Sequence, residues 1–115
     1  VTTWTHGTTG IAPLCAPSLD TPNGPEHQFL GMHEVVMDDY VKRGYVVVAT
    51  DYEGLGPPGL HPFLQGASEA HGALDIIRAA REIDPRIGAR YLAIGHSQGG
   101  QADLCTAALG PAYVP

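Results

Sequence analysis

The sequence predicts an α/β fold in which a parallel sheet lies between two layers of helices. Segments of strand type and of helical type alternate along the chain. The β-branched run Tyr45–Thr50 is continuous rather than alternating, which is typical of a strand buried on both faces of a parallel sheet. Helices between such strands form βαβ units with right-handed crossovers. We therefore expect three parallel strands in a three-layer α/β/α arrangement.

The strands are expected in three short segments. The first alternates β-branched and aromatic residues, and the third is an apolar run directly before a glycine. Long segments rich in proline and glycine follow the first two strands and are expected to be loops. The expected strands are Val1–Thr5, Tyr45–Thr50 and Tyr91–Ile94.

The helices are expected at Glu26–Arg43, Ala67–Ile83 and Gln101–Leu109. Ser68 is the expected N-cap of the second helix, and Gly110 with Pro111 should end the third. Apolar spacings of three and four residues define the buried faces of the first two helices. These faces are Phe29, Met32, Val36 and Tyr40 in the first helix, and Ala73, Ile76, Ile77, Ala80 and Ile83 in the second.

Length and charge limit the classes of function. The chain has 115 residues, a net charge of −6 and no basic run, which gives no indication of a nucleic-acid partner or an anionic membrane surface. Its apolar runs are too short for stable insertion into a bilayer. The sequence begins in a strand-like run and stops just after a helix. We expect residues 1–115 to be the N-terminal and central part of a single domain that is truncated at both ends.

The two cysteines are too few to predict a disulfide framework or a metal site. Cys105 lies in the third helix and is expected to be a small buried apolar residue. Cys15 lies in a proline-rich loop and could pair with a cysteine outside these residues. A bond between Cys15 and Cys105 is an open alternative, because the sequence does not fix the distance between them.

The motif G-H-S-Q-G at residues 95–99 matches the pattern of a nucleophile elbow. A strand precedes it and a helix follows, as the motif requires. Ser97 would occupy a strained turn at the sheet edge, and Gly95 and Gly99 would let strand and helix approach closely. The backbone N–H of Gln98 would face an oxyanion. The alternative is a glycine-rich turn with an incidental serine, although neither nucleotide-binding glycine pattern fits here.

The loop H-G-T-T-G at residues 6–10 follows the first strand. Loops after parallel strands emerge at the same edge of the sheet, so this loop should lie near Ser97. Its backbone can supply the second N–H of an oxyanion hole. The alternative is a tight turn that simply needs glycines.

The remaining acids and histidines are expected to have structural roles. Asp51 and Glu53 lie at the same edge, and we interpret them as loop anchors. His96 is next to Ser97 but should support the turn, because the elbow directs neighbouring side chains apart. The other histidines are scattered, and no pair of them with a nearby acid predicts a metal site.

The sequence lacks a complete set of catalytic groups. A serine nucleophile needs a general base and an acid that orients it, and after this elbow the acid precedes the histidine. The residues after Ser97 contain Asp103 and no histidine. Asp103 lies in the helix behind the elbow, which is the wrong place for this acid. The acid and the histidine are therefore expected beyond Pro115.

These segments together resemble the secretory lipases of the α/β-hydrolase superfamily, the group of Candida antarctica lipase A and its actinobacterial relatives. The resemblance is carried by T-W-T-H-G-T-T-G, C-A-P-S, G-Y-V-V-V-A-T-D-Y-E-G-L-G and G-H-S-Q-G-G-Q-A, which are spread over nearly the whole chain.

The resemblance implies an α/β-hydrolase fold with Ser97 as the nucleophile. The oxyanion donors would be the N–H of Gln98 and that of Thr9 or Thr8. A disulfide from Cys15 to the C-terminal half of the protein, and secretion into an oxidising space, are also implied. The lid and the catalytic Asp and His would lie in that C-terminal half, and no metal or organic cofactor is implied.

The expected function is that of a serine ester hydrolase, a triacylglycerol lipase or carboxylesterase that works through an acyl-enzyme on Ser97. Its substrate would be a lipid or a small ester. An acyltransferase or a peptidase on the same fold is an alternative. A second alternative is a non-catalytic, truncated or pseudo-hydrolase piece that only packs against a partner.

Overall fold

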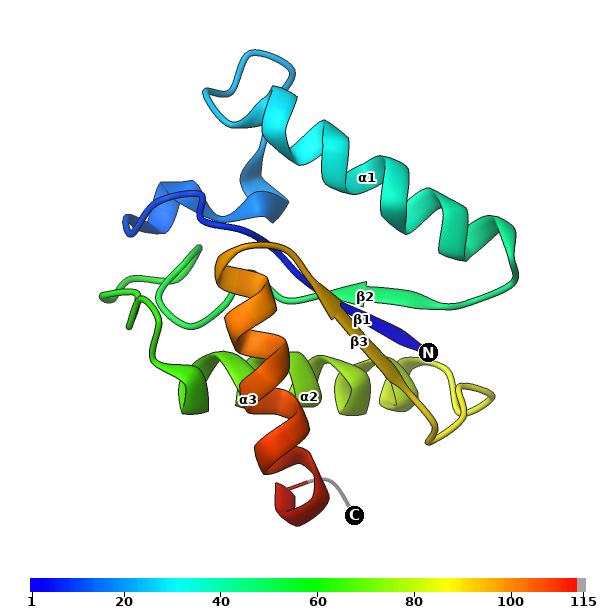
Figure 1. The fold of residues 1–115 in the computed structure, drawn as a ribbon. Coiled ribbons are helices and arrows are strands. Elements are labelled where there is room, and N and C mark those ends of the chain that lie inside the picture. Colours follow the sequence, from blue (N-terminus) through cyan, green and yellow to red (C-terminus); the bar gives the residue numbers. More distant parts are fainter. Residues whose placement is uncertain (114–115) are drawn as a thin grey trace.

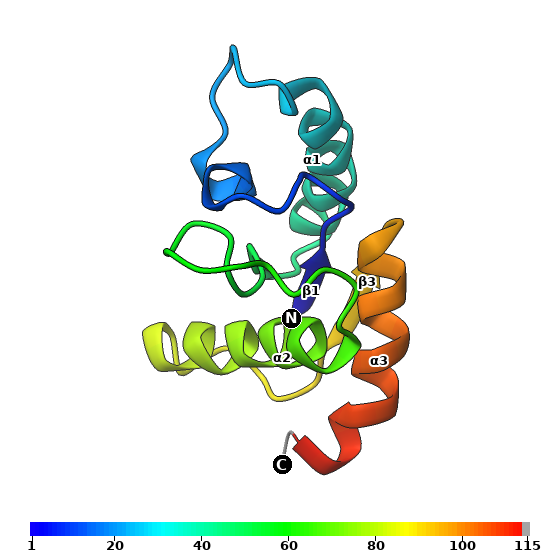
Figure 2. The same cartoon turned by 90° about the vertical axis from the view of Figure 1, so that its left-hand side faces the viewer.

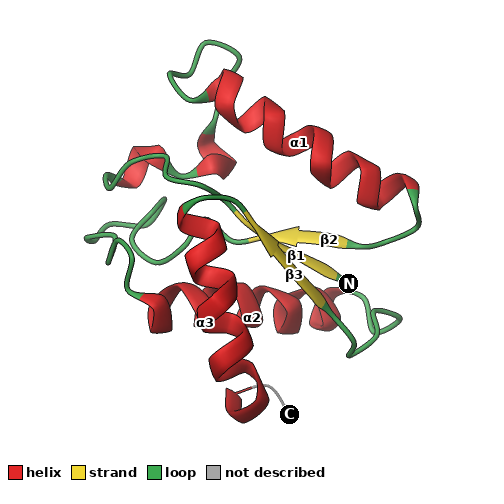
Figure 3. Ribbon diagram, viewed as in Figure 1, coloured by secondary structure: helices red, strands yellow, loops and turns green. Residues whose placement is uncertain are grey.

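In a computed structural model, which describes residues 1–113, the strands form one parallel sheet (Figures 1 and 3). The strand order is β2-β1-β3, with Thr2 paired to Val47 on one side and to Leu92 on the other. The predicted α/β fold with three parallel strands is therefore confirmed. The strands are β1 (Thr2–Thr5), β2 (Val47–Ala49) and β3 (Leu92–Gly95).

The helices cover both faces of the sheet and give the expected three layers. Helix α1 lies on one face, whereas α2 and α3 pack against each other on the opposite face (Figures 1 and 2). Two short 3-10 helices, Pro13–Cys15 and Pro17–Leu19, lie in the loop between β1 and α1. The long helices are α1 (His27–Lys42), α2 (Gly66–Ile83) and α3 (Gln98–Tyr113). None of the helices within residues 1–113 is long and apolar enough to cross a bilayer.

The central strand β1 is buried along its whole length. The hydroxyl of Thr3 donates a hydrogen bond of 2.9 Å to the carbonyl of Ala73 in α2. On the other face of the sheet, the Trp4 ring packs against His33 of α1, with ring centroids 5.2 Å apart. Strand β2, by contrast, was expected to be buried on both faces. That expectation was wrong, because β2 is an edge strand of the described sheet and Ala49 is exposed.

The buried face of α1 differs from the predicted one. Met32 is 61% exposed and Val36 is 39% exposed, whereas Leu30 and His33 are buried. The spacing of apolar residues does not indicate this face, because His33, a polar residue, occupies one of its central positions. In α2, Ala73, Ile77 and Ala80 are buried as predicted, but Ile83 is 86% exposed at the last turn.

The ends of two helices also differ from the prediction. Helix α2 begins at Gly66, so Ser68 lies inside it, and the Ser68 hydroxyl bonds to the carboxylate of Glu53 instead of capping the helix. Helix α3 continues through Pro111 to Tyr113. The guanidinium of Arg78 lies over the Tyr113 ring, 4.5 Å from its centroid, and donates to the Tyr113 carbonyl. These contacts stabilise the last turn of α3, although Pro111 has no N–H to donate a helical hydrogen bond.

The hydroxyl of Thr5 joins the end of β1 to α3. It lies 2.8 Å from the carboxylate oxygen Oδ1 of Asp103 and 3.0 Å from the carbonyl of Gly99. Burial raises the pKa of Asp103, and the hydrogen bond from Thr5 only partly opposes this. Asp103 therefore has a structural position behind the elbow, which agrees with its exclusion as a catalytic acid.

Replacing Asp103 with asparagine is expected to change how stability depends on pH. The pKa of a raised carboxyl is higher in the folded than in the unfolded state, so folding is most favoured below the usual value of 3.8 and weakens as pH rises through the folded pKa. Asp103→Asn keeps the acceptor for Thr5 and removes this dependence. Urea denaturation between about pH 3.5 and about pH 7 should show a flatter dependence of the free energy of unfolding on pH for the variant than for the parent protein. An unchanged profile would contradict the assignment.

Candidate active site

Ser97 occupies the turn between β3 and α3 in a left-handed conformation. Its φ is 57°, and the residue is exposed at the end of the sheet. A non-glycine residue with such a φ costs about 1–3 kcal/mol and persists only where the surrounding structure enforces it. The strain therefore has to be held by the contacts of the turn.

Two glycines allow those contacts. A Cβ at Gly95 would overlap with the hydroxyl of Thr5 and the carbonyl of Gly99, and a Cβ at Gly99 would overlap with the carbonyl of Thr5. The amide of His96 also donates to the carbonyl of Thr5, at 3.3 Å. The turn is therefore pressed directly onto the end of β1, as the motif predicted.

The backbone donors in the first turn of α3 differ in whether they have an acceptor among the described residues. The N–H of Gly99 donates to the carbonyl of His96 at 2.8 Å, and the N–H of Gly100 donates to the carbonyl of Ser97 at 2.9 Å. Within residues 1–113 the backbone N–H of Gln98 makes no such bond. This donor directly follows Ser97 and lies at the positive end of the helix dipole, which suits a developing negative charge.

The loop after β1 lies against this turn. A Cβ at Gly7 would be 3.1 Å from Nδ1 of His96 and 3.3 Å from its carbonyl oxygen. Thr8 and Thr9 are the next residues along the chain, within about 4–8 Å of Gly7 by Cα spacing. Thr8 is exposed, whereas Thr9 is buried and its hydroxyl has no partner among the described residues. The structure thus brings the predicted oxyanion loop to the elbow.

The histidine next to Ser97 faces helix α1. The centroid of the His96 ring lies 5.4 Å from that of His33 and 6.0 Å from that of Phe29. These contacts tie the elbow to α1, in agreement with the supporting role expected for His96.

The side chain of Gln98 is held by two residues that sequence reasoning missed. Its Nε2 lies 2.8 Å from Nε2 of His61 and 2.6 Å from Oε1 of Glu69. All three side chains are buried. His61 lies in a proline-rich loop and Glu69 in the first turns of α2, and no local pattern distinguishes either residue.

The two acids after β2 anchor other segments. The carboxylate of Asp51 accepts a 2.9 Å hydrogen bond from the backbone N–H of Ser18 and another from its hydroxyl. Glu53 accepts from Ser68 in α2. Both contacts agree with the expected role of loop anchors. Neither Cys15 nor Cys105 forms a disulfide within the described residues. Cys105 was expected to be buried, but it is only half-buried, as is Cys15.

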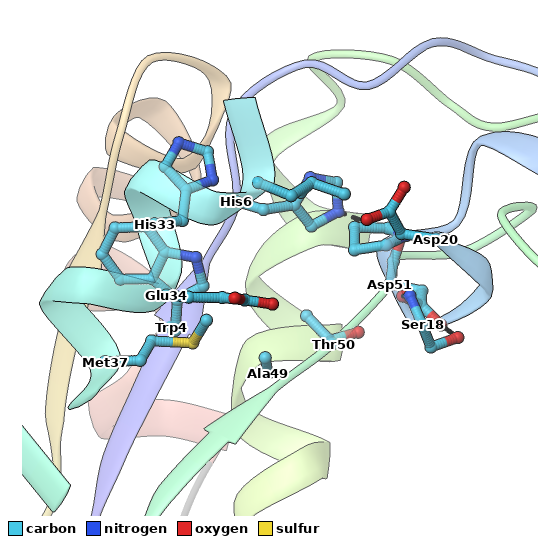
Figure 4. A pocket seen from close by; sticks show the side chains of 12 residues that line it. Trp4, His6, Ser18, Asp20, His33, Glu34, Met37, Ala49, Thr50 and Asp51 are labelled. Carbon is cyan, nitrogen blue, oxygen red and sulfur yellow. Dashed lines mark hydrogen bonds between the residues drawn. The ribbon is translucent and has the colours of Figure 1, made fainter. Parts of the chain in front are cut away.

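A cavity of about 220 Å³ lies between α1 and the sheet (Figure 4). In Figure 4, His33 lies on one side of it, Asp51 and Ser18 lie on the other, and His6 lies between them. His33 is 5% exposed, and neither of its ring nitrogens has a partner among the described residues. Burial lowers the pKa of His33, and the nearby His96 and His6 lower it further.

Replacing His33 with leucine is expected to stabilise the protein against acid. Because the pKa of His33 is lowered in the folded state, the unfolded state binds a proton more readily, and stability is lost as pH falls below the usual value of 6.5. His33→Leu removes this loss and an unpartnered polar ring, for a gain of about 1 kcal/mol at neutral pH. Thermal melts from neutral pH to below the usual histidine pKa of 6.5 would show a higher melting temperature for the variant than for the parent protein. A variant that is less stable at every pH would contradict the prediction.

The elbow predicts opposite effects for two neighbouring glycines. Gly99→Ala should lower the free energy of unfolding by at least about 3 kcal/mol, because its methyl group overlaps the backbone of β1. Gly100→Ala is the matched control, since the nearest atom to its Cβ is 4.0 Å away. It should be neutral or stabilising by up to about 1 kcal/mol. Urea denaturation of both variants provides the comparison, and equal effects would argue against the close packing.

Comparison with known proteins identifies the family. The model of the secretory lipase family matches residues 26–115. No curated protein and no solved structure matches the chain. The family match covers most of the sequence, includes the elbow, and implies that the three-stranded parallel sheet belongs to an α/β-hydrolase fold. The chain therefore belongs to the secretory lipase family.

Proposed function

We propose that this protein is a serine ester hydrolase, a triacylglycerol lipase or carboxylesterase that forms an acyl-enzyme on Ser97. Membership of the family indicates a lipase-like ester hydrolase at the coarse level. The observation that carries the finer proposal is the strained, exposed Ser97 beside the N–H of Gln98, which has no backbone acceptor within residues 1–113. Such a pairing of nucleophile and backbone donor is what acyl transfer requires.

In the proposed reaction, the hydroxyl oxygen of Ser97 attacks the ester carbonyl while a histidine takes its proton. The oxygen of the tetrahedral intermediate accepts hydrogen bonds from the N–H of Gln98 and from that of Thr9 or Thr8. The alcohol then leaves with the proton, and water hydrolyses the acyl-enzyme by the same route. One such donor is worth about 2.7–4 kcal/mol of barrier.

We place the catalytic histidine and acid beyond Pro115. Within residues 1–113, no histidine makes a hydrogen bond to Ser97, and His6 and His61 are already bonded to backbone carbonyls. Asp103 is bonded to Thr5 behind the elbow. The proposed chemistry needs neither a metal nor an organic cofactor.

The remaining expectations are proposals of the same kind. The family suggests an extracellular protein. An extracellular setting fits secretion and a disulfide from Cys15 to a downstream cysteine. We also propose that the protein is of the Candida antarctica lipase A-like type. We also propose that downstream sequence of the same protein covers exposed apolar side chains, such as Val35 at 70% and Leu104 at 76% exposure.

Covalent labelling with a fluorophosphonate, followed by peptide mapping, tests the nucleophile in the full-length protein. Label is expected on Ser97, and Ser97→Ala should lose it together with at least about a thousandfold of its activity on p-nitrophenyl esters. Ser68→Ala is the matched control, because this serine lies inside α2 with its hydroxyl bonded to the carboxylate of Glu53, and the variant should label like the parent protein.

Full activity of Ser97→Ala would overturn the proposal. Absence of both label and esterase activity in the folded parent protein would instead favour the non-catalytic alternative. Esters of graded chain length would separate a lipase from a short-chain carboxylesterase.

A further inference from the structure

We propose that His61 and Glu69 are positioning residues, which hold the side-chain amide of Gln98 and thereby aim its backbone N–H at the oxyanion. The inference rests on the proposed ester hydrolysis. His61 and Glu69 would not touch the substrate themselves but would act through the backbone N–H of Gln98.

The amide of Gln98 has an acceptor for each of its two N–H groups. Nε2 lies 2.6 Å from Oε1 of Glu69 and 2.8 Å from Nε2 of His61. The reverse orientation of the amide would place its oxygen against a carboxylate oxygen, so the hydrogen-bond network assigns the nitrogen to this side. Gln98 is 3% exposed and Glu69 is 0% exposed, so water does not compete for these bonds.

Both acceptors are themselves held in place. Nδ1 of His61 lies 2.8 Å from the carbonyl of Glu53. A carbonyl only accepts, so Nδ1 carries the hydrogen and Nε2 is left to accept from Gln98. Oε1 of Glu69 also accepts from the backbone N–H of Leu64, at 3.2 Å. The amide therefore cannot rotate without losing bonds on both sides.

Fixing this side chain fixes the residue that carries the free N–H. Gln98 directly follows the strained Ser97 and is the first residue of α3. Its amide anchors it to α2 and to the loop before α2, while its backbone donor has no acceptor within the described residues. Because oxyanion stabilisation depends on donors held in place before the reaction, a small shift of Gln98 should weaken it strongly.

The same loop also reaches the other side of the site. The ring of Tyr52 stacks on His61, with centroids 5.8 Å apart and planes 10° apart. Its hydroxyl donates a 3.0 Å hydrogen bond to the carbonyl of His6, directly before the Gly7 that contacts the elbow. Tyr52 and Leu64 both have positive φ, at 70° and 59°. Strain at these two positions is explained if the loop has to present Tyr52, His61 and the Leu64 N–H together.

Stability alone is a weak explanation of this network. The second carboxylate oxygen of Glu69, Oε2, is buried and has no partner within the described residues. A buried carboxylate that is only partly satisfied is usually no more stabilising than apolar side chains of similar size. The presence of Glu69 at this position is better explained by the orientation that it gives to Gln98.

The test uses isosteric variants of the full-length protein. Gln98→Met removes the amide, and His61→Phe removes both ring hydrogen bonds but keeps an aromatic ring against Tyr52. Glu69→Gln keeps an acceptor oxygen and is the conservative variant, to be compared with Glu69→Leu. His71→Phe is the matched control, because His71 stacks on Tyr113 near the other end of α3 and is not among the hydrogen-bond partners of Gln98 within residues 1–113.

Each variant is assayed for kcat and KM on a short p-nitrophenyl ester, with kcat expressed per Ser97 that reacts with a fluorophosphonate. Counting reactive sites removes the effect of partly unfolded protein. The inhibition constant of a trifluoromethyl ketone, whose adduct carries an oxyanion, is measured in parallel.

For Gln98→Met, His61→Phe and Glu69→Leu, kcat per reactive site is expected to fall by about 10- to 100-fold, which is less than the loss of a whole donor. KM should change little, and the inhibition constant should rise by the same factor as kcat/KM falls. Glu69→Gln should recover most of the loss seen in Glu69→Leu, and His71→Phe should match the parent protein.

Unchanged kcat per reactive site in Gln98→Met and His61→Phe would overturn the inference, as would losses that leave the inhibition constant unchanged. A Ser97→Ala variant with full esterase activity would instead refute the proposed function. The two failures are therefore distinguishable.

Discussion

The packing of the β3–α3 turn against the last residue of β1 is the constraint on which the rest of this site depends. The backbone of Gly99 lies so close to the carbonyl of Thr5 that no side chain fits between them. The amide of His96 donates to that same carbonyl. Ser97 therefore has to leave the sheet in a left-handed conformation, and its position follows from the backbone of β1 rather than from flexible side chains.

Around this contact, segments that are far apart in the sequence converge on a few atoms. The loop after β1 touches the turn through Gly7, and helix α1 touches it through the ring contact of His33 with His96. From the opposite face of the sheet, Glu69 of α2 binds the side chain of Gln98. The turn is thus supported from both layers of helices, which is consistent with the cost of holding a strained serine.

Much of the fold was predictable from local patterns, because strand runs, helical spacings and loop composition are local properties. The turn around Ser97 was predictable for the same reason, since Gly95 and Gly99 flank it within a single motif. The burial of His33 was not predictable, because its position depends on Trp4 in another layer and the apolar spacing of α1 favoured a different face. The contacts of His61 and Glu69 with Gln98 join residues 37 and 29 positions apart, and no local pattern indicates them.

The threonines of β1 have a consequence for how this sequence can diverge. Thr3 and Thr5 tie the central strand to the helices by hydrogen bonds to the carbonyls of Ala73 and Gly99. Burial of apolar side chains is non-directional, so it does not by itself fix how far along the strand a helix lies. A hydrogen bond tolerates little change in length, so it fixes the height of α2 and α3 along the strand. Changes in the size of apolar residues elsewhere in these layers should therefore leave the height of the serine turn relative to the sheet unchanged.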